Sequence, residues 1–580
     1  MNRKLGFYIW TMILLILVIS DVAGSEQFTI SLNAGFNGVY QVAAHTPVRI
    51  TVGNSGRAVN AEISFRLIEN YSARDTPVTK EYRKKVFIPE GTSSVTLPVQ
   101  LNSYRPGCRI TILKEDLILY EEQFDLKGFP SDSPLIVGIS RNPSLDPLLP
   151  LISEEENFPL VYPHPETFPN VWNGLSGAGL VIFHRLPSVP LTDGQIDALV
   201  NWTAAGGKIL IIGGSSYSQE TRVLLDTLLP VKFTGFTELP GGIRISRIAP
   251  PAEGQIYSHD GTVTGIRKNL GKGWVTFLTF DPSRAESSAL LRPLWNEIFP
   301  GPILAGSGPR IPQPVVTREI FSRTGSTPRF IPTLPVFIIL GVYTLMLAAL
   351  MLFPAPIFRL RIIGAAVLTL SAVFAVFFLF ELSGTVESDF TRALTILRGG
   401  SGDVLVTEKH VHHGSVGETR FTFQLDKDSV FLPYPRQEGV LSFAPDGAAY
   451  YSDTLQNPWN SRYYRSVGIT RRQIQFDVQK KNGLYMVSAK EPGDFRLSES
   501  ILFIHGEPYS IGVLQSGTVY TVDPGNQTRI RIPDRMRPYI ELIRRSEQWT
   551  ELNSTYDYVI AGLVDTGTII LIGGNIVPFS

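Results

Sequence analysis

The stretch LTDGQIDALVNWTAAGGKILIIGGSSYSQE, residues 191–220, decides how the central part of the chain is expected to fold. Thr192 is suited to N-cap a helix, because Gln195 follows three residues later as its capping-box partner. Gly206-Gly207 is typical of a helix end, since glycine tolerates the left-handed conformation found there. The run KILII (208–212) is short and wholly apolar after its first residue, as in a buried strand. The stretch therefore predicts a helix followed by a strand.

Three continuous apolar runs precede this unit: PLIVGIS (134–140), FPLVYP (158–163) and GLVIFHRL (179–186). Strands that are buried on both faces of a parallel sheet need such runs. Strands that alternate with helices predict a doubly wound, flavodoxin-like α/β domain, which we place at 131–300. Any ligand of such a sheet is expected beyond the carboxyl ends of the strands.

The two flanking regions have a different pattern. Residues 26–130 and 388–580 contain short alternating runs, such as VRITV (48–52) and TRFTFQL (419–425), separated by turn residues. We predict an immunoglobulin-like β-sandwich over 26–130 and a β-rich domain over 388–580. Cys108 is the only cysteine of the chain, so no intramolecular disulfide is possible, and we interpret it as a small packed residue.

Two long apolar segments, 331–353 and 362–383, are each long enough to cross a bilayer as a helix. The loop between them, 354–361, carries Arg359 and Arg361. Arginine in a short loop predicts that the loop is cytoplasmic. The sequence therefore predicts a transmembrane hairpin.

The remaining segments complete the predicted topology. Residues 1–24 are typical of a signal peptide or an uncleaved N-terminal anchor, and the proline-rich stretch 301–330 is expected to be a linker. We predict a multi-pass protein of the bacterial cytoplasmic membrane, with both large regions extracytoplasmic and the lipid bilayer as one partner. The formal net charge is zero and long basic runs are absent from the sequence, which argues against nucleic acid as a partner.

This order of parts resembles a bacterial family of uncharacterised membrane proteins, which carry an extracytoplasmic class I glutamine-amidotransferase-like domain and a two-helix transmembrane hairpin. The matching stretches are LTDGQIDALVNWTAAGGKILIIGGSSYS (191–218), LLPV (228–231) and GKGWVTFLTFDPS (271–283). The resemblance implies an amidotransferase-like fold for the α/β domain. Active members of class I hold a cysteine on the strand-to-helix turn, where Ser215 stands here. The resemblance therefore implies that amidotransferase activity has been lost.

The turn Gly213-Gly214-Ser215-Ser216 is the main candidate for chemistry. Ser215 is a candidate nucleophile of an extracytoplasmic serine hydrolase, with His259 as its base and Asp260 or Asp281 to orient the histidine. The four turn residues are also candidates for ligand binding. The alternative is structural: the glycines form a tight turn, and Ser215 and Ser216 cap the next helix.

A second candidate lies in the sequence HVHHG. On a strand, Glu408, His410 and His412 share one face, where they could bind zinc. The alternative is a polar exposed edge, and no cofactor is expected. Aromatic residues in 459–466 and at Tyr434 suggest a sugar-binding surface, or else half-buried strand and loop residues.

Taken together, these observations predict a multidomain fold: a β-sandwich, an amidotransferase-like α/β domain, a transmembrane α-hairpin and a C-terminal β-rich domain. The predicted function is that of a membrane-anchored binding or scaffold protein of the bacterial envelope without catalysis. Its predicted partner is another envelope or membrane protein, with a transporter suggested by analogy of fold alone. A serine hydrolase using Ser215 and a carbohydrate-binding protein are the alternatives.

Overall fold

The computed structural model describes residues 27–299 and 389–578 with short gaps, and also the isolated positions 303, 304, 364 and 371. The gaps lie at 70–77, 103–105, 142–144, 153–157, 240–241, 250–253, 272, 285–290, 401–404, 416–418, 426–428, 433–438, 445–447, 456–459, 471–473, 491–494, 526–539, 541–556, 566–567 and 575–576.

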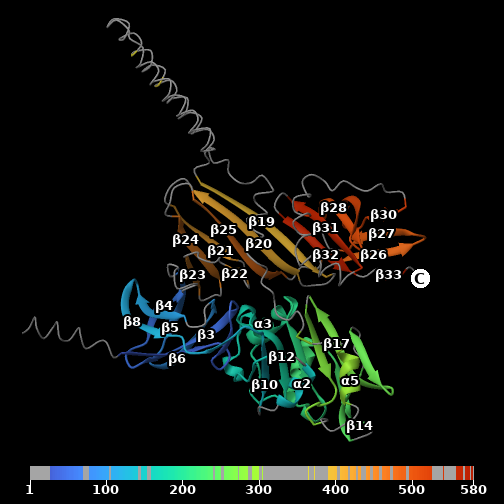
Figure 1. Ribbon diagram of the computed structural model, residues 1–580, viewed down its shortest axis with the longest axis horizontal. Coiled ribbons are helices and arrows are strands. Elements are labelled where there is room, and N and C mark those ends of the chain that lie inside the picture. Colours follow the sequence, from blue (N-terminus) through green and yellow to red (C-terminus); the bar gives the residue numbers. More distant parts are fainter. Residues whose placement is uncertain are drawn as a thin grey trace, which may run out of the picture.

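The predicted fold class is wrong, because the structure is dominated by strands. Of the described residues, 63% lie in strands and 14% in helices. The helices of this part of the chain are short, whereas the strands are arranged in several sheets (Figure 1). The helices that alternate with the central strands are short, from 4 to 12 residues, so they contribute little to the described residues as a whole.

The N-terminal strands form a β-sandwich. One sheet is antiparallel and contains β1 (Phe28–Ala34), β3 (His45–Asn54) and β6 (Gly91–Gln100). The facing sheet contains β4 (Val59–Glu69), β5 (Val78–Ile88), β7 (Gly107–Lys114) and β8 (Leu117–Asp125). A short parallel pair, β2 (Val39–Gln41) and β9 (Phe129–Ser131), lies beside them. Both sheets contribute to one apolar core, in which Cys108 is buried as predicted.

Strands from the C-terminal region extend this sandwich. β23 (Gly439–Phe443) pairs in parallel with β5, from Gly439 opposite Lys80 to Phe443 opposite Lys84. β24 (Ala449–Leu455) and β21 (Thr419–Leu425) follow, and give the seven-stranded order β21-β24-β23-β5-β4-β7-β8. Figure 1 shows these orange strands meeting the blue N-terminal strands. Regions about 360 residues apart in the chain therefore share one sheet.

The central region contains a mixed sheet in the order β11-β10-β12-β13-β18-β17-β16, whose first five strands pair in parallel. The bounds of its strands are β10 (Leu135–Ser140), β11 (Leu160–Val161), β12 (Ala178–His184), β13 (Lys208–Ile212), β16 (Gln255–His259), β17 (Thr262–Leu270) and β18 (Gly273–Leu278). A separate hairpin is formed by β14 (Lys232–Leu239) and β15 (Ile243–Ala249).

Short helices cover both faces of this mixed sheet. On one face, α3 (Asp193–Ala204) and α4 (Gln219–Leu228) pack into an apolar core with the sheet. On the other face, α2 (Leu149–Ile152) and α5 (Leu291–Ile298) pack into a second apolar core. The predicted capping box of α3 is confirmed, because Thr192 and Gln195 bond each other's main chain. Short 3-10 turns are η2 (Asp146–Leu148), η3 (Pro165–Thr167), η4 (Trp172–Leu175) and η5 (Gly214–Ser216).

Two further sheets make up the C-terminal region. The eight-stranded sheet has the order β22-β25-β20-β19-β32-β31-β28-β29, and the four-stranded sheet has the order β30-β27-β26-β33. Val406 and Val467 of the larger sheet pack into the core that contains α3, so the layers contact each other. The strand bounds are β19 (Asp389–Gly400), β20 (Leu405–Ser415), β22 (Val430–Leu432), β25 (Asn460–Thr470), β26 (Phe476–Lys481), β27 (Leu484–Ala489), β28 (Arg496–Ile504), β29 (Glu507–Gln515), β30 (Val519–Val522), β31 (Tyr558–Asp565), β32 (Thr568–Gly574) and β33 (Val577–Pro578).

The multi-pass membrane location is contradicted by the structure as described. Within the described ranges, no helix has the length and apolar character to cross a bilayer, and α3 is the longest with 12 residues. A membrane-spanning helix needs about 20 residues. The predicted hairpin segments lie outside the described residues apart from positions 364 and 371, as do 1–24 and nearly all of 301–330.

The seam between β5 and β23 should be sensitive to the size of one side chain. A Cβ atom added at Gly439 would lie 2.0 Å from the hydroxyl of Tyr451, whose ring is buried. We expect Gly439→Ala to lower the free energy of unfolding by about 1–3 kcal/mol through overpacking. Gly107→Ala is the matched control, because a Cβ at that strand glycine meets nothing within 4 Å. Urea unfolding followed by circular dichroism would measure both; equal stability of the two variants would contradict the prediction.

Candidate functional site

The carboxyl edge of the mixed sheet brings together polar side chains that are distant in sequence. β12, β13 and β18 are parallel neighbours, so their carboxyl ends meet at one edge. β12 ends at His184, the turn Gly213–Ser216 follows β13, and Asp281 lies shortly after β18. The carboxyl-terminal parts of these strands are buried, and the polar residues lie at or just beyond their ends.

Asp281 is the centre of this cluster. Its Oδ2 atom is 3.3 Å from His184 Nε2 and accepts a hydrogen bond of 3.1 Å from Ser215 Oγ. Ser216 Oγ also donates to Oδ2, and the Arg185 guanidinium lies 3.3 Å from it. The other oxygen, Oδ1, accepts from Ser283 Oγ at 2.6 Å and from the Ser283 main chain at 3.1 Å. Both carboxylate oxygens are therefore occupied by donors of this chain.

The electrostatics of the cluster favour the ionised carboxylate. Burial raises the pKa of Asp281, but hydrogen bonds from His184, Ser216 and Ser283 and the charge of His184 outweigh burial. The net effect holds the pKa of Asp281 well below its usual range. A carboxylate with so low a proton affinity is a weak general base.

The backbone around the cluster is constrained. Gly214 has a φ of +59°, and a Cβ there would lie 2.6 Å from the Arg244 carbonyl oxygen and 2.8 Å from the Asp281 amide nitrogen. Only glycine fits this position without a backbone shift. Arg185 has a φ of +45°, which is uncommon for a residue with a side chain. Its guanidinium is held by Asp281 and by Ser216 Oγ at 3.4 Å.

This arrangement differs from a serine-hydrolase triad. In a triad the histidine lies between the serine and the acid, so that the imidazole takes the serine proton. Here the carboxylate of Asp281 lies between Ser215 and His184. The hydroxyl of Ser215 donates to a poor base, and the cluster has the character of a structural clasp at the sheet edge.

The structure does not bring the predicted base to the predicted nucleophile. His259 ends β16, which is separated from β13 by β18 and β17. Three strand spacings correspond to roughly 14 Å. His259 Nε2 instead lies 3.7 Å from the carboxylate of its neighbour Asp260, whose side chain is 79% exposed.

The helix that follows this turn, α4, is not capped by the serines that the sequence suggested. Ser218, rather than Ser215 or Ser216, is the N-cap of α4, and it forms a capping box with Thr221. Ser215 and Ser216 lie in the short turn η5, where their hydroxyls bond Asp281. The sequence signal for this was present, because Thr221 follows Ser218 by three residues.

The zinc candidates lie on β20, on one face as the alternation predicts. His410 Nε2 is 3.6 Å from Glu408 Oε2, but Arg465 donates to the same oxygen at 2.9 Å and Arg398 contacts Oε1. His412 is buried and stacks on Tyr463 with ring centroids 4.3 Å apart. The side chains are buried and not at a polar exposed edge.

The charges around Glu408 oppose a bound cation. Burial raises the pKa of Glu408, but the two arginines outweigh burial and hold it well below its usual range. Burial lowers the pKa of His410, an effect that Glu408 opposes and Arg465 reinforces. Among the described residues no group of three or more potential ligands is placed to hold a metal. Two guanidinium groups already contact the carboxylate that a metal would need.

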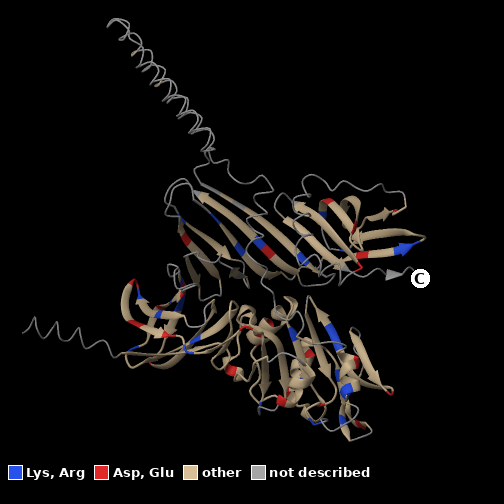
Figure 2. Ribbon diagram, viewed as in Figure 1, with Lys and Arg blue, Asp and Glu red and all other residues tan. Residues whose placement is uncertain are grey.

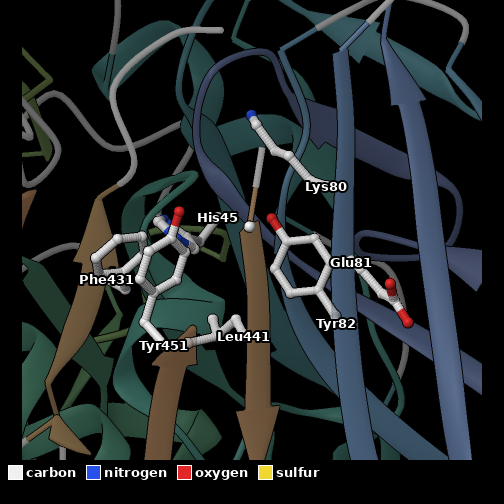
Figure 3. A pocket seen from close by; sticks show the side chains of 8 residues that line it. His45, Lys80, Glu81, Tyr82, Phe431, Leu441 and Tyr451 are labelled. Atoms are coloured by element: carbon white, nitrogen blue, oxygen red, sulfur yellow. The ribbon is translucent and has the colours of Figure 1, made fainter. Parts of the chain in front are cut away.

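A small cavity at the seam was not predicted from the sequence. It measures about 20 Å³, enough for about one water molecule, and lies between the N-terminal sandwich and the C-terminal strands. Its lining residues are His45, Lys80, Glu81, Tyr82, Phe431, Gly439, Leu441 and Tyr451 (Figure 3). Burial and the charge of Lys80 lower the pKa of His45 to about 4, although a hydrogen bond to the Phe431 main chain opposes them. Local sequence could not reveal it, because the lining comes from segments hundreds of residues apart.

Comparisons with known proteins identify only the first domain. Residues 27–127 match a family described as a domain of unknown function, DUF8726. No curated protein matches the chain. This match covers the sandwich alone and assigns no activity.

The solved structures that match are distant. A β-glucosidase from Listeria innocua in complex with glucose is 14% identical, with 18% of this chain and 16% of that chain covered and a TM-score of 0.14. A Paenibacillus sp. cycloisomaltooligosaccharide glucanotransferase complexed with cycloisomaltoheptaose is 14% identical, with 31% and 28% covered and a TM-score of 0.13. The chain thus spans about a sixth of the glucosidase, and such TM-scores carry no argument. The amidotransferase-like resemblance stays a prediction.

Removing the charge of Asp281 should destabilise the clasp. We expect Asp281→Asn to lower the free energy of unfolding by about 3 kcal/mol at neutral pH, because the Arg185 guanidinium loses its counter-charge and the serine donors lose the carboxylate. The folded-state pKa is depressed, so this stability is fully present above the unfolded pKa of about 3.9 and is lost as pH falls below it. The difference between wild type and variant, measured by urea unfolding at several pH values, should therefore shrink at acid pH. Asp260→Asn is the exposed control, and a pH-independent difference would refute the assignment.

The ion pairs of Glu408 with Arg398 and Arg465 can be tested in the same way. We expect Glu408→Gln to lower the free energy of unfolding by about 3–5 kcal/mol, since it removes the negative charge that two buried arginines contact. Glu507→Gln, at the exposed start of β29, should change it by less than about 0.5 kcal/mol. Thermal unfolding with and without zinc would check the alternative: a zinc-dependent rise in Tm that disappears in His410→Ala would support a metal site instead.

Proposed function

We propose that the chain is a non-catalytic binding protein that presents one sheet edge to another protein. The observation that carries this proposal is β8, the terminal strand of the seven-stranded composite sheet. Within the described ranges, β8 pairs with β7 on one side only. The main-chain groups of its outer edge are directed away from the sheet, as in sites where a partner adds a strand.

Exposed apolar side chains mark the beginning of this edge. Leu117 is 65% exposed and Ile118 is 56% exposed. The tight turn before them has positive φ at Glu115 and Asp116, and it fixes the direction in which β8 leaves β7. Large apolar residues on an exposed sheet edge promote aggregation unless a partner covers them. Their position supports a protein partner rather than a small molecule.

The second half of β8 is acidic and defines the partner's chemistry. Glu121, Glu122 and Asp125 are exposed on this strand, and acidic residues mark this outer end of the sandwich in Figure 2. Arg109 lies 3.1 Å from Glu121 and partly balances its charge. The occupant that fits is an extended protein segment with an apolar beginning and Lys or Arg residues beyond it.

The alternatives have less support from the described contacts. Ser215 donates to a poor base, which does not favour a serine hydrolase. Of the aromatic residues considered for sugar binding, Tyr464 is fully buried in an aromatic cluster and Tyr463 stacks on His412. Trp459 and Tyr434 lie outside the described residues.

Site-specific crosslinking in the native host tests the proposal. A photo-crosslinking amino acid at Leu117 should capture one reproducible protein, whereas the same group at the exposed Val223 of α4 should not. Capture from Leu117 should fall about tenfold when Glu122→Lys and Asp125→Lys are combined, because a basic partner segment is then repelled. Equal capture from both positions would refute this docking edge.

Activity-based labelling tests the part of the proposal that concerns the absence of catalysis. The purified chain should not react with a fluorophosphonate probe, since among the described residues the Ser215 hydroxyl donates to Asp281, which is a poor base. Labelling that Ser215→Ala abolishes would show a nucleophilic serine and overturn the non-catalytic proposal.

A further inference from the structure

A lysine, a glutamate and an asparagine meet inside the N-terminal sandwich. Glu69 is the last residue of β4, Lys80 lies on the neighbouring β5, and Asn102 follows β6 of the opposite sheet. Glu69 is fully buried and Lys80 is 4% exposed. Lys80 and Glu69 are among the most costly residues to bury, so this pair needs an explanation.

One carboxylate oxygen of Glu69 contacts the side-chain nitrogen atoms of both Lys80 and Asn102. Lys80 Nζ is 2.9 Å from Glu69 Oε2, and Asn102 Nδ2 donates to the same oxygen at 3.2 Å. The main-chain nitrogen of Asn102 donates to Glu69 Oε1 at 2.6 Å. Glu69 therefore holds the amine of Lys80 next to the side-chain amide of Asn102, with the Asn102 backbone fixed in place.

The surroundings ease the loss of a proton from Lys80. On β4, Leu67 pairs with Lys80 on one side and with Cys108 on the other, and both Leu67 and Cys108 are fully buried. Burial lowers the pKa of Lys80, although the charge of Glu69 opposes this shift. An uncharged amine in a dry site is a nucleophile, and lysines are activated in this way in other proteins.

We propose that Lys80 and Asn102 form an intramolecular isopeptide bond, with Glu69 as the proton shuttle. Glu69 takes a proton from the Lys80 ammonium group, and Nζ attacks Cγ of Asn102. The Nζ–Cγ bond forms and the Cγ–Nδ2 bond breaks. Glu69 gives this proton to Nδ2 and accepts the second proton of Nζ, so that one molecule of ammonia leaves, the new amide keeps one hydrogen and Glu69 ends protonated. No oxidant, reductant or other co-reactant is required, because both reacting groups and the shuttle belong to the fold.

The position of the bond gives it a mechanical role. It links β5 of the composite sheet to the end of β6, and so joins the two sheets of the sandwich covalently. Lys80 is also the residue opposite Gly439 where β23 pairs with β5. Figure 3 shows the Lys80 side chain running away from Glu81 on the strand that lines this seam. The bond would fix the strand on which the C-terminal region docks, in a chain that cannot form an intramolecular disulfide.

Mass spectrometry of the purified full-length chain tests the proposal. In a tryptic digest, the peptides that contain Lys80 and Asn102 should be recovered as one branched species, lighter than their sum by one ammonia. Trypsin should not cleave after Lys80, because its amine is acylated. This readout does not depend on how the N-terminus is processed.

Matched variants separate the bond from the buried ion pair. Lys80→Arg and Glu69→Gln should give unlinked peptides of full mass. Asn102→Asp keeps the acyl group and should still crosslink, now with loss of one water instead of ammonia. This variant covers the case in which Glu69→Gln or Lys80→Arg fails to fold.

Two results would overturn the proposal. A folded wild-type chain that yields a linear peptide ending at Lys80, with the Asn102 peptide at full mass, would show that the trio is only a hydrogen-bonded ion pair. Full crosslinking in Glu69→Gln would show that Glu69 is not the shuttle.

Discussion

Main-chain pairing between β5 and β23 is the interaction on which the rest of this structure depends. It is a parallel ladder of five residue pairs, from Lys80 opposite Gly439 to Lys84 opposite Phe443. Without it, the N-terminal sandwich would end at an open β5 edge, and β23, β24 and β21 would form a separate small sheet. The shared apolar core follows from this pairing, since Phe431, Tyr451 and Tyr464 pack with Phe65 and Tyr82.

Two buried polar clusters also hold neighbouring strands together. Asp281 ties three parallel strands at their carboxyl edge through His184, Ser215 and Ser216. Glu408 does the same across β19, β20 and β25 through Arg398 and Arg465. In each case one buried carboxylate is surrounded by donors from neighbouring strands, which gives these carboxylates a structural role.

The sequence revealed local structure better than it revealed partners. The capping box of Thr192 and Gln195, the buried strand 208–212 and the packing of Cys108 follow from neighbouring residues, and all are present in the structure. Pairing such as β5 with β23 depends on residues about 360 positions apart, which no local period can encode. The same limit applies to the candidate site. The sequence identified Ser215, but it could not show that Ser215 bonds Asp281 rather than His259. Strand order decides which of these residues are neighbours, and local patterns do not encode it. The fold-class prediction failed because strands outweigh helices among the described residues, and none of the described helices supports the predicted membrane location.

The ladder between β5 and β23 also sets the timing of folding. During synthesis, β5 emerges about 360 residues before the strand that pairs with it. At the usual 5–20 residues per second, that interval is roughly 20–70 s. For this time the edge of β5 is an open template for any other strand, including that of another nascent chain. Closing so large a loop is slow, because most of its entropy is lost before the ladder forms. The yield of folded protein should therefore depend on how well nascent chains are kept apart, more than on the stability of the finished sheet.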